Sequence, residues 1–268
     1  MRVVVSPGIY SGPTNKNLNL TNGVSVVGLA GAAQTIIDCA DSGRGFDISG
    51  SLTNLLIRGL TIQNGYAGAG GGIRCVGCGI AIDECVVTNN CTDLAPGGGL
   101  YFDGSQAVVR NSVISANNAG FWGGAVFSLG SALEMDNCIL AGNNAAMGGG
   151  AVLCNGTNLI VRNCTVISNY AGGVVNGGGI AVASGSATVE NTILWGNDPS
   201  QLKVDGGSLT SRYSCVQDGW TGTGNITNDA QFLAGTYRLQ SGSPCIDAGI
   251  SNTLSSDINW ALRWDDPA

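Results

Sequence analysis

The chain has 268 residues, a formal net charge of −7 and no histidine. The absence of histidine excludes serine–histidine and cysteine–histidine catalytic arrangements and removes the commonest metal ligand. Only 11% of the residues are charged and the basic ones are scattered, which argues against nucleic acid as a partner. No apolar run approaches the length of a transmembrane helix, so we expect no insertion into a membrane.

Residues 1–64 contain short apolar runs with irregular spacing, among them VVVSPGIYSG and QTIIDCADSGRGFDISG. We interpret these runs as the N-terminal coils of a repeat. Pro7 and Gly8 interrupt the first run, so it does not read as a signal peptide, and a secreted protein would be present here in its mature form. Ten cysteines favour an oxidising compartment.

Residues 65–198 repeat a pattern of asparagine, a variable loop, a glycine cluster and alternating Val- and Ile-rich runs. Two landmarks recur with the same steps of 27, 26, 26 and 28 residues: first Ile73, Leu100, Val126, Val152 and Ile180, then Cys85, Ser112, Cys138, Cys164 and Thr192. Short strands at such a period predict an all-β fold, a parallel β-helix with coils of about 26 residues. The glycines would form its corners, and stacked amides would form a ladder of Asn64, Asn89, Asn117, Asn143 and Asn169.

One slot of the repeat carries charges of alternating sign. Over seven coils its residues are Arg58, Asp83, Arg110, Asp136, Arg162, Glu190 and Arg212. Opposite charges stacked on neighbouring strands stabilise a sheet, and they would also hold the register of the repeat. We therefore predict a structural charge ladder, because a strip that binds substrate would carry one sign.

The cysteines recur in two slots of the repeat, which indicates disulfides within a coil. The predicted pairs are Cys75–Cys85 and Cys154–Cys164, and weaker candidates are Cys78–Cys91 and Cys215–Cys245. Cys39 and Cys138 would remain unpaired. The alternative is that these cysteines are small buried core residues, which free cysteine often is.

Residues 199–249 leave the regular pattern and read as a last coil and a cap, so that residues 1–249 form a single β-helix domain. Residues 250–268 read as a tail, and the chain is expected to be part of a longer protein.

The motifs VVVSPGIYSGP, GLTIQNGYA, NTILWGN, YSCVQDGWTGTGNI and LQSGSPCIDAG resemble, in this order, the right-handed parallel β-helix repeat proteins of environmental bacteria, notably planctomycetes. The glycine-rich and NN signals also resemble, more loosely, the repeats of chlamydial polymorphic outer-membrane proteins. The first resemblance implies a pectate-lyase-like fold and a secreted or cell-surface location. It does not imply a single activity, because this fold carries lyases, hydrolases, epimerases and adhesins.

An enzyme of this fold, either a polysaccharide lyase or a glycoside hydrolase, would need close carboxylates, and the candidates are Asp83, Glu84 and Asp103. They form no cluster of one sign on successive coils, so the sequence favours a protein that is not an enzyme. No cofactor and no metal site is indicated, and calcium, which some lyases of this fold use, stays an open alternative without a specific signal.

A binding role has more support, because one set of loops in a solenoid commonly forms the binding edge. The large side chains in these loops and next to them make Phe121, Trp122, Tyr170 and Trp195 the predicted ligand-binding residues. We therefore expect an adhesive or carbohydrate-contacting module whose partner is a polysaccharide or a cell-surface ligand. A rigid stalk is a further alternative, and the oligomeric state stays open.

Overall fold

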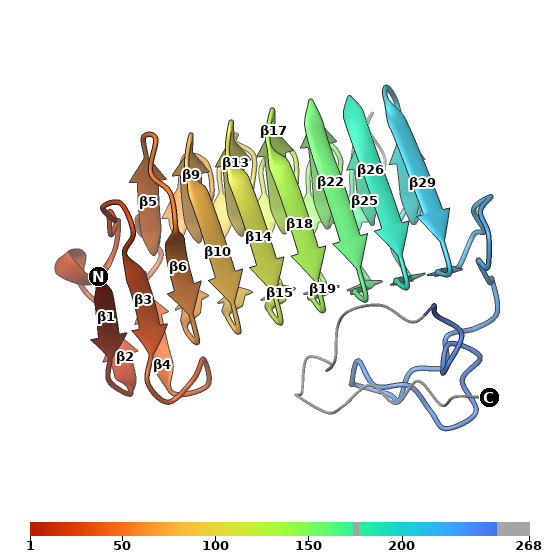
Figure 1. Ribbon diagram of the computed structural model, residues 1–268, viewed down its shortest axis with the longest axis horizontal. Coiled ribbons are helices and arrows are strands. Elements are labelled where there is room, and N and C mark those ends of the chain that lie inside the picture. Colours follow the sequence, from red (N-terminus) through yellow and green to blue (C-terminus); the bar gives the residue numbers. More distant parts are fainter. Residues whose placement is uncertain (174–176, 251–268) are drawn as a thin grey trace.

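The computed structural model describes residues 1–173 and 177–250, so most of the predicted tail lies outside the described residues. The prediction of an all-β parallel solenoid is confirmed: the chain winds through four parallel sheets, which we call A, B, C and D. Figure 1 shows successive strands of one sheet side by side along the axis. A 3-10 helix, Pro13–Asn15, lies in the N-terminal coil.

Each regular coil runs through sheets A, B, D and C in that order, and each sheet stacks one strand per coil. Sheet A contains β1 (Arg2–Val5), β3 (Ser25–Gly28), β6 (Leu55–Arg58), β10 (Gly79–Asp83), β14 (Gln106–Arg110), β18 (Ala132–Asp136), β22 (Thr157–Arg162), β26 (Gly185–Glu190) and β29 (Ser208–Arg212). Sheet B contains β2 (Gly8–Tyr10), β4 (Thr35–Asp38), β7 (Thr61–Gln63), β11 (Val86–Thr88), β15 (Val113–Ser115), β19 (Ile139–Ala141), β23 (Thr165–Ile167), β27 (Ile193–Trp195) and β30 (Cys215–Val216). Sheet C contains β5 (Phe46–Ser49), β9 (Ile73–Val76), β13 (Leu100–Asp103), β17 (Val126–Leu129), β21 (Val152–Asn155), β25 (Ile180–Val182) and β28 (Leu202–Val204). Sheet D contains β8 (Tyr66–Ala67), β12 (Cys91–Thr92), β16 (Asn118–Ala119), β20 (Asn144–Ala145) and β24 (Tyr170–Ala171).

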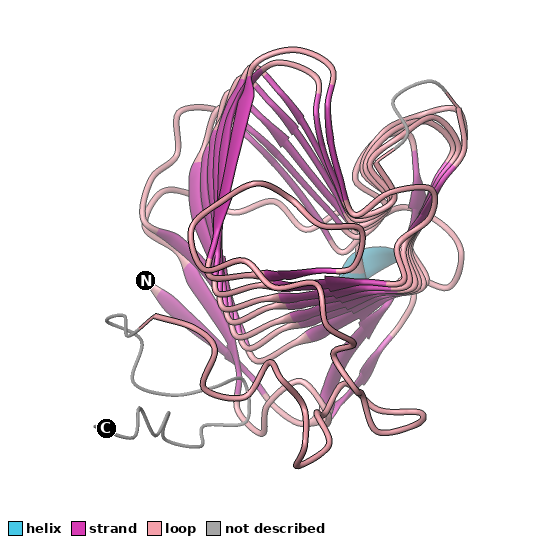
Figure 2. Ribbon diagram, turned by 90° about the vertical axis from the view of Figure 1, so that its right-hand side faces the viewer, coloured by secondary structure: helices cyan, strands magenta, loops and turns pink. Residues whose placement is uncertain are grey.

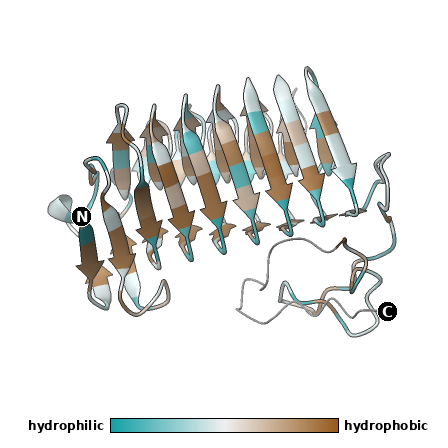
Figure 3. Cartoon of the chain, viewed as in Figure 1, coloured by the Kyte–Doolittle hydropathy of each residue, from teal (hydrophilic) through white to brown (hydrophobic). Residues whose placement is uncertain are grey.

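The three longer sheets enclose the core, and Figure 2 shows them end-on with the short sheet D and its loops as a side lobe. Side chains alternate along each strand, so Ile80 and Ile82 of β10 are buried inside while Asp83 faces outward. Equivalent apolar residues stack from coil to coil, and hydrophobic positions recur along sheet A (Figure 3). The alternating runs of the sequence are therefore strands with one face in the core.

The asparagine ladder exists, but it begins one coil later than predicted, at Asn90, which takes the place predicted for Asn89. Its buried members are Asn90, Asn117, Asn143, Asn169 and Asn197. Asn143 Oδ1 accepts hydrogen bonds from the backbone N–H and the Nδ2 of Asn117, both at 3.0 Å. The prediction was wrong for Asn64 and Asn89, which adopt left-handed backbone with φ of 55° and 54°.

The glycine clusters allow the chain to turn, and they also allow the backbones of neighbouring coils to approach each other closely. Gly97 has φ of +71°, as a corner requires. A Cβ on Gly98 would lie 2.5 Å from the carbonyl oxygen of Gly124 and 2.7 Å from the carbonyl carbon of Asn118. The second glycine of the cluster is thus needed because the loop returns directly against the backbone of the next coil.

The disulfides predicted for Cys75–Cys85, Cys154–Cys164 and Cys78–Cys91 are wrong. Cys75 pairs with Cys78, with a Cα–Cα distance of 6.2 Å, while Cys85, Cys154 and Cys164 are free buried thiols. Cys75 lies in β9 of sheet C, and β10 of sheet A separates it from the turn that contains Cys85. The recurrence of cysteine in a slot reflected stacking between coils rather than bonding within one.

The second cysteine slot is a column of thiols and hydroxyls at the corner between sheets A and B. Cys138 N donates to Cys164 Sγ at 3.3 Å, and Cys164 N donates to Thr192 Oγ1 at 3.4 Å. Cys85 N donates in the same way to Ser112 Oγ at 3.1 Å. Cysteine, serine and threonine can replace one another here, because each has a small side chain whose sulfur or oxygen accepts a hydrogen bond from the backbone N–H of the preceding coil.

Candidate functional site

The charged column runs across the C-terminal ends of the sheet A strands from β6 to β29. The strand register stacks, in order, Arg58, Asp83, Arg110, Asp136, Arg162, Glu190 and Arg212. Each charge therefore has neighbours of opposite sign on the adjacent strands. The carboxylate at its centre, Asp136, is 2% exposed, whereas the arginines on either side of it, Arg110 and Arg162, are 48% and 33% exposed.

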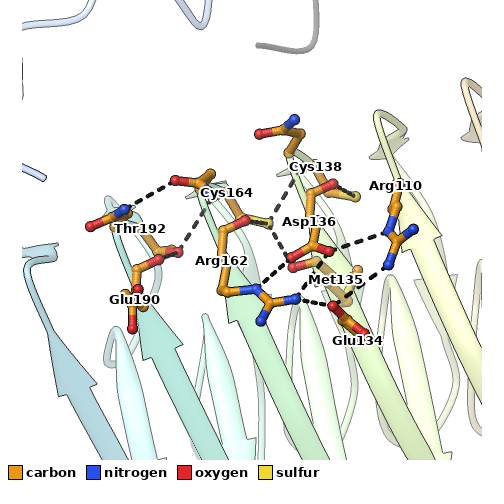
Figure 4. Close-up of polar contacts among 12 residues, drawn as sticks. Arg110, Glu134, Met135, Asp136, Cys138, Arg162, Cys164, Glu190 and Thr192 are labelled. Carbon is orange, nitrogen blue, oxygen red and sulfur yellow. Dashed lines mark hydrogen bonds and ion pairs between the residues drawn. The ribbon is translucent and has the colours of Figure 1, made fainter. Parts of the chain in front are cut away.

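At its centre the column forms a cluster of two arginines and two carboxylates (Figure 4). Asp136 lies 3.3 Å from Arg110 Nε and 2.9 Å from Arg162 Nε, and Glu134 pairs with both arginines. Burial raises the pKa of Asp136, and the charge and hydrogen bond of Arg110 oppose that rise. Two positive and two negative charges balance locally, so this cluster has no net charge to attract an ion.

Asp83 and Glu84, two of the candidate catalytic acids, both pair with Arg58 at the N-terminal end of the column. Asp83 lies 3.5 Å from Arg58 Nε, and Arg58 also pairs with Glu84. Asp83 in addition accepts a hydrogen bond from Asn111 Nδ2 at 2.9 Å. These contacts hold both carboxylates in fixed partnerships along the surface.

Asp103, the third candidate acid, is separated from Asp83 by about the length of one sheet A strand. It ends β13 in sheet C, just before β14, whereas Asp83 pairs with Arg110 at the far end of β14. Four strand steps between Gln106 and Arg110 correspond to about 13 Å. Paired acids in glycoside hydrolases are closer than about 10 Å, so the structure does not bring these residues together.

Neither a metal cluster nor a membrane-spanning helix is found in the described ranges 1–173 and 177–250. No three His, Cys, Asp or Glu side chains there are close enough to hold a metal ion. No helix there is long and apolar enough to cross a bilayer.

Phe121 and Trp122 form a small aromatic cluster in the side lobe. Their ring centroids are 4.2 Å apart with an interplanar angle of 64°, and Trp122 stacks on Phe127 at 6.1 Å. Phe127 in turn stacks on Tyr101 at 5.7 Å. This second apolar cluster lies against the outer face of sheet C, so Trp122 is half-buried and holds the loop to the sheet.

The other two predicted binding residues lie on different sheets. Tyr170 begins β24 in sheet D and is 50% exposed. Trp195 ends β27 in sheet B, next to Ile167 of the preceding coil, and is half-buried. The four residues thus occupy three places, and the structure does not join them into one site.

An exposed row on sheet D was missed by the sequence analysis apart from Tyr170. The register stacks Tyr66, Cys91, Asn118, Asn144 and Tyr170, one from each of five successive coils. We call these five residues the sheet D row. At a spacing of about 4.8 Å per coil, it extends over about 19 Å parallel to the axis.

The sheet D row is held on a rigid edge. The residues after its last three members, Ala119, Ala145 and Ala171, are buried, and the asparagine ladder lies directly before them. Backbone N–H groups of Asn118 and Asn144 donate to the carbonyls of Asn90 and Asn117 at 2.8 Å. Small inward residues and the buried amide ladder therefore hold the outward side chains at a fixed spacing.

The row presents polar and aromatic groups without formal charge. Tyr66 is 47% exposed, and Asn118 and Asn144 are exposed between the two tyrosines. Within the described residues, the side-chain amides of Asn118 and Asn144 make no hydrogen bond, so both face solvent. Burial raises the pKa of Cys91, which keeps this thiol neutral. The NN doublets were the available signal: in Asn117–Asn118 and Asn143–Asn144 the first Asn enters the ladder and the second faces outward, whereas in Asn89–Asn90 the second enters it.

The comparisons with known proteins agree with this architecture. A family model described as a right-handed β-helix region matches residues 8–150 and, in a second overlapping register, residues 68–215. No curated protein and no solved structure matches the chain significantly. Because the matched segments together extend from residue 8 to residue 215, well over half of the sequence, the chain belongs to the family of right-handed β-helix proteins.

Proposed function

We propose that this protein is a carbohydrate-contacting surface module, and that the sheet D row is its contact site. The single observation behind the proposal is that two exposed tyrosines bracket two exposed asparagines on one straight edge. Aromatic faces pack against the apolar faces of sugar rings, while amides donate to and accept from hydroxyl groups. The row offers both kinds of contact at regular intervals.

The row suits an extended neutral polysaccharide lying parallel to the solenoid axis. Its residues carry no formal charge, so a polyanion would gain no ion pair from them. The backbone beneath is fixed by the strand pairing of sheet D, so binding orders only a few side chains. A preorganised linear array of this kind favours a polymer over a compact ligand.

The proposal does not include catalysis. The candidate acids Asp83 and Asp103 lie at opposite ends of a strand, and Asp83 and Glu84 share one arginine. A polysaccharide lyase or hydrolase would need carboxylates that act together on one bond. A rigid stalk remains the reading to adopt if no polysaccharide binds.

A secreted or cell-surface location belongs to the same proposal. The bridge between Cys75 and Cys78 supports it, because disulfides persist in oxidising compartments and are rare in the cytosol. Polysaccharides that a surface protein could contact are found in the same environment.

The test is co-sedimentation of the full chain with insoluble neutral polysaccharides, with analysis of the supernatant for released sugars. We expect sedimentation without products, and we expect the double variant Tyr66→Ala/Tyr170→Ala to lose at least tenfold in affinity. Tyr237→Ala is the matched control, because Tyr237 is a similarly exposed tyrosine, 45%, outside sheet D. Unaltered binding by the double variant would exclude this row, and newly released sugars would favour the enzymatic alternative.

A further inference from the structure

The C-terminal end of the solenoid is covered by a segment that folds back on the last coil. After β30 the chain turns, and Val216 N donates to Ile226 O at 2.9 Å while Ile226 N donates to Ser214 O at 2.9 Å. Trp220, between these pairs, packs against the main hydrophobic core. The first half of the cap, residues 217–228, thus covers the edge of the last coil.

The second half of the cap, residues 229–250, is attached to the solenoid at two identifiable places. Figure 1 shows this part of the chain as blue loops that leave the last coil. Ile250 and Asn191 exchange two hydrogen bonds, at 2.8 and 2.9 Å. Cys245 is the other place, because its thiol is hydrogen-bonded to the thiol of Cys215 in β30.

The loop geometry holds Cys245 in this position. Cys245 N donates to Ser243 Oγ at 3.1 Å, and Ser243 Oγ donates to Ala230 O at 2.7 Å. On the other side, Cys215 Sγ contacts Asn228 O at 3.4 Å. Both cysteines are therefore anchored to the same short stretch of the cap, residues 228–230, as free thiols that share a hydrogen bond.

We propose that Cys215 and Cys245 form a second disulfide, which fastens the cap to the last coil. The bond joins the two Sγ atoms, and each thiol gives up its proton. The two electrons go to a small-molecule disulfide such as oxidised glutathione, which is reduced to two thiols. Cys245 attacks first and forms a mixed disulfide, and Cys215 then displaces the small thiol.

The environment of the two thiols fits this order of steps. The hydrogen bond with Cys215 lowers the pKa of Cys245 to about 7, although burial acts in the opposite direction. The same hydrogen bond raises the pKa of Cys215, and burial adds to the rise. Cys245 is also the more exposed of the two, so it is the thiol that a soluble oxidant reaches.

Cys138 and Cys164 provide an internal control, because they are also adjacent thiols. Cys138 Sγ lies 3.4 Å from Val109 O and 3.3 Å from Asp136 O, and Cys164 Sγ contacts the equivalent carbonyls of its own coil and the preceding one. Both thiols are buried, and burial raises the pKa of Cys138 well above its usual range. We expect this pair to stay reduced where Cys215 and Cys245 are oxidised.

The first experiment is to equilibrate the reduced full chain with oxidised glutathione, unfold it in an alkylating agent and map the cysteines by mass spectrometry. The expected result is a cross-linked peptide pair containing Cys215 and Cys245, with Cys138 and Cys164 alkylated as thiols. Recovery of Cys215 and Cys245 as alkylated thiols, or a bond between Cys138 and Cys164 in their place, would overturn the proposal.

Limited proteolysis then tests the fastening of the cap. In the oxidised protein we expect cleavage within residues 231–250 to be at least tenfold slower than in the Cys245→Ser variant, while Cys138→Ser should match the oxidised parent. Equal cleavage rates for the oxidised parent and Cys245→Ser would show that the bond does not hold the cap. Neither result depends on whether the sheet D row binds carbohydrate.

Discussion

The environment of a single residue in this protein is set largely by the equivalent residues of the two neighbouring coils. Asp136 is acceptable in a buried position because Arg110 and Arg162 flank it from the two neighbouring strands. A buried charge of this kind is costly unless it is paired and hydrogen-bonded. The alternation of sign along the column therefore stabilises the fold, because it gives each charge a partner of opposite sign on the adjacent strand.

Reversing one charge in the centre of the column should destabilise the fold. Arg110→Glu would bring a third carboxylate beside Glu134 and Asp136, where the pairing of Arg110 is lost and repulsion is added. Asp136 is buried but Arg110 is 48% exposed, so solvent screens part of the effect, and we expect a loss of about 1–2 kcal/mol in the free energy of unfolding, measured by chemical denaturation. An unchanged midpoint would show that the column is incidental.

The matched control for that reversal is Arg212→Glu at the end of the column. Arg212 is about as exposed as Arg110, 53% against 48%, but it pairs with Glu190 alone, whereas Arg110 faces both Glu134 and the buried Asp136. The expected loss is below about 1 kcal/mol. A loss as large as that of Arg110→Glu would contradict the argument that the buried Asp136 sets the effect.

At the scale of elements, the ladder of buried amides sets the corner at which sheet B passes into sheet D. Each ladder residue serves two neighbouring coils: Asn143 Nδ2 donates to Asn169 Oδ1 and to Ile114 O, both at 2.9 Å, while its Oδ1 accepts from Asn117. The ladder thereby fixes where the short strands of sheet D begin. The side chains on the outer face of sheet D inherit their spacing from it.

Removing one amide from the ladder should cost far more than removing the amide next to it. Asn143→Ala would remove the side-chain acceptor of the buried Asn117 N–H and three further hydrogen bonds, to Asn117 Nδ2, Ile114 O and Asn169 Oδ1, which costs about 3 kcal/mol or more in the free energy of unfolding. Asn144→Ala removes an exposed amide and should change stability by less than about 0.5 kcal/mol. Thermal and denaturant unfolding of the pair measures the difference, and similar losses would contradict the ladder.

At the scale of the whole molecule, the solenoid places equivalent residues of successive coils in a straight line, with the same distance between neighbours. The sheet D row, the charged column and the thiol–hydroxyl column are three such lines on one rod. A binding edge built in this way has a length set by the number of coils that contribute to it. Five coils contribute to the sheet D row, from Tyr66 to Tyr170.

The length of the row predicts how affinity depends on the size of an oligosaccharide. For the neutral polysaccharide that sediments the protein, affinity should rise with each added sugar until the chain spans about 19 Å, and then level off. Isothermal titration with a series of oligosaccharides measures this dependence. Affinity that is independent of length would indicate a site for a single sugar and not an extended row.

Sequence periodicity alone determined the fold class, the length of the coil and the charged column, because stacking repeats every coil and each landmark keeps its place. It placed Asn117, Asn143 and Asn169 in the ladder for the same reason. It misplaced Asn89, because this residue takes the left-handed conformation of the corner and the doublet Asn89–Asn90 does not show which asparagine is inward. The same ambiguity hid Asn118 and Asn144, which are the outward members of their doublets.

Only the tertiary structure decided which residues meet across the coil. It paired Cys75 with Cys78 and not with Cys85, separated Asp103 from Asp83, and packed Trp122 onto Phe127 while leaving Tyr66 and Tyr170 exposed. These outcomes depend on where the corners turn and on how the lobe folds against sheet C. The repeat in the sequence records what stacks along the axis, whereas contacts around the coil follow from loop paths that differ from one coil to the next.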